Sequence, residues 1–121
     1  QTDFGWEYAP ESLYHAVVEL IPYRKPIYIL ENGIADASDT LRQEFIPTAL
    51  AALHRAITAG ALVRVYFYWS LLDNFEWDKG YWLRFGLIHI DYATQTRTIR
   101  PSAQAYAEVC RTNELILTPP R

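Results

Sequence analysis

Two short apolar runs constrain the fold of this chain most strongly: residues 26–30 (PIYIL) and residues 63–69 (VRVYFYW). Runs of this length that are rich in β-branched and aromatic residues are typical of strands. The first run has no polar alternation, which indicates a strand covered on both faces, as in a parallel sheet. The second run is again mostly apolar. We therefore expect two buried, parallel strands.

A helix is predicted before the first run. Pro10 suits the first turn of a helix, and Leu13, Val17 and Leu20 would share one of its faces. This helix should end before Pro22, because an interior proline removes a backbone donor and clashes with the preceding turn.

A longer helix is predicted between the two runs. Thr40 and Gln43 have the spacing of a capping box at its start, and Gly60 suits the C-cap position at its end. The apolar stripe between them consists of Leu41, Phe45, Ala49, Leu50, Leu53 and Ile57. Pro47 interrupts the stripe. Because an interior proline costs about 3 kcal/mol or more, we expect a kink or a restart of the helix there.

The last third of the chain predicts a short extended segment at 86–91 and a helix that begins near Pro101. One face of this helix would carry Ala103, Tyr106, Ala107 and Cys110. Residues 113–121 form a tail that contains a Pro-Pro pair. The order helix, strand, helix, strand, helix is a piece of a β/α alternation, so residues 1–121 are expected to belong to a single α/β domain.

Composition excludes several classes of function. The formal net charge is −3 and there is no basic block, so charge-driven binding to nucleic acid or to an anionic membrane is not expected. The single cysteine, Cys110, allows no intrachain disulfide and favours a reducing, cytoplasmic setting. No apolar run reaches the roughly 20 residues of a membrane span. No phosphate loop or metal-ligand cluster is evident, so no cofactor and no metal are predicted. The missing initiator Met suggests a chain cut from a longer one.

Glu31 stands where the first predicted strand ends, directly before Asn32-Gly33. One interpretation is an exposed carboxylate ahead of a turn. The other is catalytic, because in (β/α)8 barrels the reacting groups lie at the carboxyl ends of the strands. A carboxylate held there could act as nucleophile, general base or metal ligand, and the sequence alone leaves both interpretations open.

The segment 67–86 (FYWSLLDNFEWDKGYWLRFG) combines many aromatic rings with acidic and amide side chains. Some of these rings, Tyr66, Phe67 and Tyr68 among them, suit an ordinary core. An apolar core does not tolerate unpaired acidic groups, however, and the loop also contains Asp73, Asn74, Glu76 and Asp78. Flat rings beside carboxylates and amides favour a binding site for a sugar, whose C–H faces stack on aromatics and whose hydroxyls need acceptors.

Trp6, flanked by Asp3 and Glu7, precedes the first predicted helix. It is predicted either to fix the entry into that helix or to form a wall of the same pocket. His15 and His54 lie on helical stretches and His89 on an extended one, and none of them has a partner at metal-ligand spacing.

The stretches YILENG (28–33) and WSLLDNFEW (69–77) together resemble glycoside hydrolase family 1, the retaining β-glucosidase and β-glycosidase family. Similar segments extend over nearly the whole chain: residues 2–14, 50–60, 84–98 and 100–109. The short link after ENG is similar to that of the archaeal and thermophile-type branch. Two long motifs in the right order make the resemblance specific.

The resemblance implies an α/β fold that is the C-terminal quarter of a (β/α)8 TIM barrel: its seventh and eighth strands with flanking helices. Glu31 matches the catalytic nucleophile of the family. Trp69 and Glu76 match residues that bind the sugar in the −1 subsite, Glu76 through the hydroxyls at C4 and C6. Trp77 matches a second aromatic contact, Phe85 is a looser match, and Trp6 corresponds to a wall on the aglycone side. Tyr68 departs from the histidine that the same branch often has.

The resemblance also shows what this sequence lacks. The acid/base carboxyl of the family lies in an NEP motif on the fourth strand, and NEP does not occur here. Three hypotheses follow: part of a β-glycosidase that hydrolyses a β-glycoside within a complete barrel, a non-catalytic sugar-binding module, or a fragment that only assembles. Two strands cannot close a sheet. We therefore expect an N-terminal companion segment or a homo-oligomer.

Overall fold

The computed structural model describes residues 1–115, and most of the predicted tail, residues 116–121, lies outside the described residues. Its centre is a parallel pair of strands, β1 (Ile27–Asn32) and β2 (Val63–Tyr68), joined by helix α2 (Thr40–Thr58). The expected parallel strands and their helical crossover are therefore confirmed.

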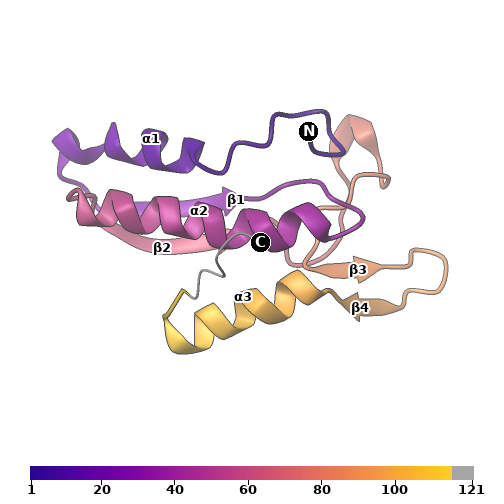
Figure 1. The fold of residues 1–121 in the computed structure, drawn as a ribbon. Helices are drawn as coiled ribbons and strands as arrows, with labels where there is room; N and C mark the ends of the chain where they lie inside the picture. The colour runs from indigo at the N-terminus through magenta and orange to yellow at the C-terminus, as the bar shows by residue number, and fades with distance from the viewer. Residues whose placement is uncertain (116–121) are drawn as a thin grey trace.

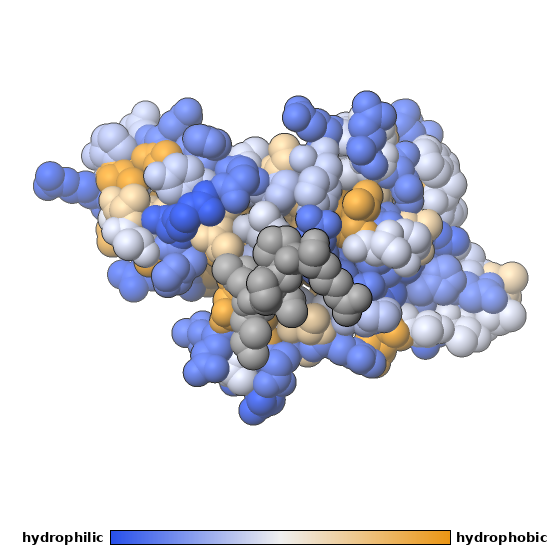
Figure 2. All heavy atoms as spheres, viewed as in Figure 1, coloured by the Kyte–Doolittle hydropathy of each residue, from blue (hydrophilic) through white to orange (hydrophobic). Residues whose placement is uncertain are grey.

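The helices pack against one another along this sheet. Helix α2 lies between α1 (Ser12–Val18) and α3 (Pro101–Thr112), with both strands behind it in Figure 1. The largest buried cluster lies between these elements, and its members include Val17, Ile27, Phe45, Ala49 and Leu53. Figure 2, drawn from the same side, shows a mostly polar surface with small apolar patches. The helices thus cover one face of the sheet and turn their polar sides to water.

The other face of the sheet corrects the expectation of strands covered on both sides. Tyr28 and Leu30 on β1 are 56% and 67% exposed, and Phe67 on β2, expected in the core, is 55% exposed. The register pairs Tyr28 with Val65 and Ile29 with Tyr66, so the three exposed side chains share one face. Within residues 1–115 no element covers this face, which we call the open face.

Several helix details also differ from the sequence expectations. Leu20 follows α1 and is exposed, because the chain enters a 3₁₀ turn, η1 (Ile21–Tyr23), that includes Pro22. Helix α2 runs through Pro47 as one element, without the expected restart. Gly60, with φ +109°, follows its C-cap residue Ala59 and ends the helix as expected.

The predicted capping box is wrong, because Thr40 is already helical and the N-cap residue is Asp39. The backbone N–H of Arg42 in the first turn donates instead to the Asp36 carboxylate at 2.9 Å. On α3 the partly buried side includes Ala103 and Tyr106, as expected. Ala107 and Cys110 are exposed, since Ser102 occupies the most buried position.

A second, smaller sheet follows β2. Strand β3 (Ile88–Ile90) confirms the short extended segment predicted at 86–91, and it pairs antiparallel with β4 (Arg97–Ile99), which the sequence did not indicate. The long loop between β2 and β3 contains the 3₁₀ turn η2 (Trp77–Lys79). This loop carries most of the aromatic and acidic side chains singled out above.

Candidate active site

An open depression of about 340 Å³ lies where β1 and β2 end. Its lining contains all six residues that the sequence singled out and two more: Trp6, Glu31, Asn32, Gly33, Trp69, Glu76, Trp77 and Phe85. These residues come from four segments: the N-terminal loop, the end of β1, the loop after β2, and the stretch before β3. The structure therefore brings the predicted site residues together.

Glu31 lies near the end of β1, and its side chain is exposed. The chain can leave the strand there because Gly33 has no side chain: a Cβ at this position would overlap the backbone carbonyl of Trp69. The ends of the two strands are consequently in direct backbone contact. This contact sets Glu31 and Trp69 on the rim of the same depression.

Two hydrogen bonds fix the strand ends further. The backbone N–H of Trp69 donates to the carbonyl of Asn32 at 3.0 Å, and the Tyr66 hydroxyl donates to Asn32 Oδ1 at 3.0 Å. Burial raises the pKa of the Tyr66 phenol well above its usual range, with a smaller contribution from Tyr106, so this donor keeps its proton. Asn32 is a lining residue that sequence reasoning missed, although it directly follows Glu31.

Glu76 is half-buried in the loop after β2, and its carboxylate accepts two hydrogen bonds. The Asn74 amide donates to Oε1 at 2.8 Å, and the Trp69 indole N–H lies 3.4 Å from the same oxygen. The peptide bond between Trp69 and Ser70 is cis. The contact between the Trp69 indole N–H and Glu76 sets a carboxylate and the edge of an indole on one wall of the depression.

The remaining walls are aromatic. Trp77 begins the turn η2 with a positive φ of 50° and is 82% exposed. In the N-terminal loop, Trp6 stacks on Phe4 with ring centroids 4.2 Å apart, and its ring centroid lies 6.2 Å from that of Phe85. Trp6 is 51% exposed and lines the depression, so it is not the buried anchor of α1 that was one of its two predicted positions.

Two of the loop carboxylates that suggested a sugar site lie elsewhere. Asp73 is buried and accepts bonds from the backbone N–H groups of Gly86 and Ile90, at 2.9 and 3.2 Å. Arg84 and His89 contact the same carboxylate at 3.2 and 3.1 Å. Asp73 thus joins the loop to β3 and has a structural place. Asp78 is exposed and pairs with Lys79 outside the depression.

Tyr68, the departure from the family pattern, is buried behind the depression. Burial raises the pKa of its phenol, although the nearby Arg42 guanidinium opposes this effect. Arg42 Nε donates to the Tyr68 oxygen at 3.0 Å, and that oxygen lies 3.4 Å from the backbone of Ile34. Tyr68 therefore does not line the depression.

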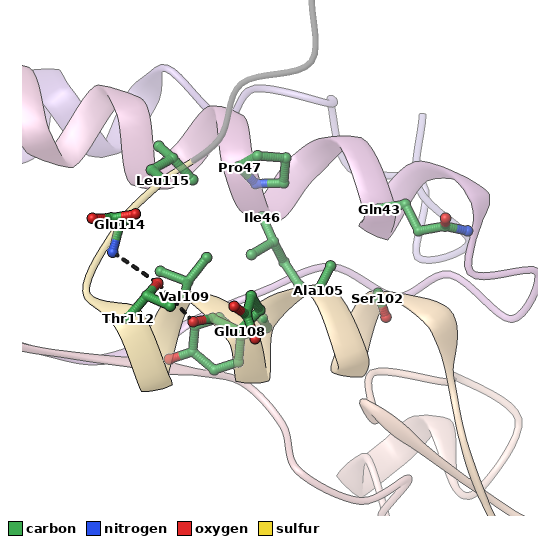
Figure 3. Close-up of a pocket in the computed structure, with 11 residues that line it drawn as sticks. Gln43, Ile46, Pro47, Ser102, Ala105, Glu108, Val109, Thr112, Glu114 and Leu115 are labelled. Atoms are coloured by element: carbon green, nitrogen blue, oxygen red, sulfur yellow. Dashed lines mark hydrogen bonds between the residues drawn. The ribbon is translucent and has the colours of Figure 1, made fainter.

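A second pocket, of about 280 Å³, lies between α2 and α3 and includes Ile46, Pro47, Ala105 and Val109 (Figure 3). It contains none of the six predicted site residues. Across residues 1–115, no group of three His, Cys, Asp or Glu side chains is arranged to hold a metal ion. Among the helices described, none is long and apolar enough to cross a membrane.

Comparison with known proteins shows the family to which the chain belongs. The family model for glycosyl hydrolase family 1 matches residues 1–115. The chain therefore belongs to glycosyl hydrolase family 1, whose members are (β/α)8 barrels with glycosidase activity. What the structure describes is a small α/β piece of such a fold.

Individual relatives are similar over almost the whole chain. A β-galactosidase from Sulfolobus acidocaldarius is 44% identical over 113 residues, which are 93% of this chain and 23% of the relative. The structure of a β-glycosidase from Pyrococcus horikoshii superposes with a TM-score of 0.93 at 44% identity, covering 97% of this chain and 28% of the other. A β-glucosidase from Thermotoga maritima, in complex with deoxynojirimycin, has a TM-score of 0.91 at 35% identity, covering 96% and 29%. The chain thus spans about a quarter of the length of these relatives.

Proposed function

We propose that this chain is the C-terminal quarter of a β-glycosidase barrel and supplies its nucleophile and much of its sugar-binding wall. In this assignment β1 and β2 are the seventh and eighth strands, and residues 1–121 form one segment of a single domain. The observation that carries the proposal is the convergence of Glu31, Trp69 and Glu76, from two separate sequence motifs, on one depression.

Glu31 is the proposed nucleophile. Its carboxylate attacks the anomeric carbon of a terminal β-linked sugar, the bond to the leaving group breaks, and a glycosyl-enzyme intermediate forms; water then releases the sugar with retention. Its exposed place at a strand end supports this role, because the attacking oxygen must reach the substrate. The reaction uses two carboxyl groups and water and needs no cofactor.

The remaining lining residues are proposed to hold the sugar. Glu76 accepts the hydroxyls at C4 and C6, while Trp69 and Trp77 contact the ring. Phe85 supports the wall that Trp6 extends toward the leaving group. The alternation of a carboxylate with broad aromatic faces around the depression supports this division of roles.

The acid/base carboxyl is proposed to come from outside this chain. A retaining mechanism needs a second carboxyl about 5–5.5 Å from the nucleophile, and Glu76 is assigned to the sugar instead. The open face, formed by Tyr28, Leu30 and Phe67, supports assembly with an N-terminal companion segment or with further copies of the chain. We also propose a cytoplasmic location, which the single and exposed cysteine, Cys110, supports.

Covalent labelling tests the proposed nucleophile. We would compare the chain alone with a completed barrel, defined as this chain joined behind the part of the P. horikoshii β-glycosidase that precedes the matched region. Both are incubated with a 2-deoxy-2-fluoro β-glucoside bearing an activated leaving group, and intact mass is measured. We expect one glycosyl adduct on the completed barrel and none on its Glu31→Gln variant.

Two outcomes would contradict the proposal. A completed barrel that unfolds cooperatively but is never labelled would favour the non-catalytic sugar-binding alternative, provided that it still binds glucose. An equal adduct on the Glu31→Gln variant would place the nucleophile elsewhere. Labelling of the chain alone would show that copies of this segment can assemble a working site without the companion.

A further inference from the structure

The two oxygens of the Glu76 carboxylate have different surroundings. Both hydrogen bonds that it accepts reach the same oxygen, Oε1: one from Asn74 Nδ2 at 2.8 Å and one from Trp69 Nε1 at 3.4 Å. Among residues 1–115, no protein donor reaches Oε2 within hydrogen-bond distance. One oxygen is therefore held by the protein, and the other is available to a ligand in the depression.

The Asn74 side chain is itself held in one orientation. The Ser70 hydroxyl lies 3.2 Å from Asn74 Oδ1 and 2.8 Å from the carbonyl of Leu72. A reversed amide would set its oxygen against the Glu76 carboxylate, so that two acceptors would face each other without a proton. The Glu76 carboxylate thus requires that an Asn74 N–H group faces it, which leaves Asn74 Oδ1 as one of two acceptors within reach of the single Ser70 hydroxyl proton.

Ser70, Asn74 and Glu76 form a short chain of side-chain hydrogen bonds, which we call the relay. Both ends of the relay are hydrogen-bonded to the backbone of other segments. Ser70 is buried, its N–H lies 3.3 Å from the carbonyl of Phe85, and its own carbonyl accepts from Leu87 at 2.9 Å. At the other end, the N–H of Glu76 donates to the carbonyl of Gly80 at 2.7 Å. The relay is therefore held by the segment before β3 and by the turn η2, rather than by the loop alone.

We infer that Asn74, held by Ser70, is a positioning residue that turns Glu76 Oε2 toward the sugar and thereby determines how strongly the site selects for the C6 hydroxyl. This inference rests on the proposed function, in which Glu76 accepts sugar hydroxyls. A hydrogen bond to one oxygen of a carboxylate restricts its rotation, so the second oxygen is presented in one direction. Without Asn74 the carboxylate rotates more freely, and a substrate that offers the C6 hydroxyl loses its advantage.

Substrate discrimination in the completed barrel tests the inference. We would measure kcat/KM for an aryl β-glucoside and for the matching aryl 6-deoxy-β-glucoside, which lacks only the C6 hydroxyl. For Asn74→Ala we expect the ratio of kcat/KM for the glucoside to kcat/KM for the 6-deoxy-glucoside to fall about tenfold. The reason is that Glu76, the proposed acceptor of the C6 hydroxyl, loses a hydrogen bond to its charged carboxylate. The loss in kcat/KM should be larger for the glucoside than for the 6-deoxy substrate, which keeps only the C4 hydroxyl for Glu76.

Tyr92→Phe is the matched control. The Tyr92 hydroxyl lies 3.4 Å from the backbone carbonyl of Asn74, so this variant loosens the same residue without touching its side-chain amide. We expect its ratio to equal that of the unmodified protein. If Asn74→Ala does not fold, Ser70→Ala releases Asn74 Oδ1 while leaving its amide in place, and a smaller fall in the ratio is expected.

The outcomes separate this inference from the function on which it rests. If Asn74→Ala lowers kcat/KM equally for both substrates, or leaves the ratio unchanged, Asn74 is only structural and the inference is overturned. The same holds if Tyr92→Phe changes the ratio as much. A folded completed barrel that hydrolyses neither substrate would overturn the proposed function, and this inference with it.

Discussion

Gly33 shows how a single residue can determine the shape of the site. It directly follows the Glu31-Asn32 pair, and its lack of a side chain lets the end of β1 approach the backbone of Trp69. Because Gly33 has no Cβ, the proposed nucleophile Glu31 and the indole of Trp69, directly after β2, can line one depression. The sequence predicts a turn at this glycine, but its close contact with the segment after β2 depends on the tertiary structure.

Gly33→Ala is expected to destabilise the protein and to disturb the depression. The added Cβ would overlap the Trp69 carbonyl, and overpacking of this kind costs about 1–3 kcal/mol. Chemical denaturation measures the loss in the free energy of unfolding. Gly5→Ala is the control: Gly5 has a φ of +86° but no neighbouring atom within 4 Å, so it reports backbone strain alone. A smaller loss for Gly33→Ala than for Gly5→Ala would contradict this account.

The Asp36 carboxyl is expected to make the free energy of unfolding depend on pH. Burial raises the pKa of its carboxyl, but hydrogen bonds from Ser38 and Arg42, with the charge of Arg42, outweigh this effect and bring the pKa below its usual value. A carboxyl with a lowered folded-state pKa stabilises the protein above its unfolded pKa of about 3.9, and this contribution is lost as the pH falls through the folded value.

We therefore expect the free energy of unfolding to decrease as the pH falls below about 4. The Asp36→Asn variant should be less stable at pH 6 but should lose less on acidification, because it has no carboxyl to protonate. Urea unfolding of both proteins, at pH 6 and at a pH below about 4, measures how much free energy of unfolding each one loses. An equal decrease in both proteins would show that other carboxyls determine the acid sensitivity.

At the scale of elements, Arg42 connects the start of helix α2 with its surroundings through several polar contacts. It is fully buried, forms an ion pair with Asp39 at 2.5 Å, and donates to the carbonyls of Asp36 and Arg84 at 2.7 Å each. Asp39 in turn accepts from Ser102 at the start of α3. The loop after β1, the start of α2 and the start of α3 are thus fixed to one guanidinium.

Arg42→Met should cost about 3–5 kcal/mol, because it leaves the buried Asp39 carboxylate without its charged partner. Thermal and urea unfolding measure this loss. Arg55→Met is the matched control, since Arg55 pairs with Glu11 on the surface, where water screens the charges. We expect little change in the control. A comparable loss in both variants would mean that the buried network contributes no more than a surface pair.

At the scale of the whole molecule, the parallel pair of strands is covered by helices on one face only. Tyr28, Leu30 and Phe67 form the open face, and an apolar sheet surface of this kind favours association. In a closed barrel the same side chains would face the interior. The exposed surface is therefore consistent with a segment of a larger fold, as the length of the relatives also indicates.

The chain alone is expected to self-associate at micromolar concentration. Replacing Leu30 and Phe67 by lysine should reduce association while the helices remain folded, because charges on the open face oppose its burial. Light scattering coupled to size-exclusion chromatography, with circular dichroism, measures both effects. Lysine at Tyr23 and Ile99, which are exposed outside this face, adds the same charge as a control. A monomeric unmodified chain would contradict the expectation.

The sequence by itself determined the local elements and the residues of the site. Hydrophobic periodicity and the positions of Pro101 and Gly60 located the strands and helices closely, since these signals act over a few neighbouring residues. The two motifs around Glu31 and Glu76, together with the wider family resemblance that adds Trp6 and Phe85, singled out six residues that line one depression. Their roles in binding and catalysis remain predictions.

Only the tertiary structure decided which polar groups serve the fold and which face the depression. Asp73 and Glu76 stand three residues apart in one acidic, aromatic loop. The family resemblance gave Glu76 a role, but the residue types alone did not show that Asp73 is buried. Asp73 is buried because Arg84, His89 and two backbone N–H groups converge on it from later in the chain. Glu76 faces the depression beside Asn74. Burial depends on contacts distant in sequence, and for the same reason the apolar run of β1 did not reveal that one of its faces is open.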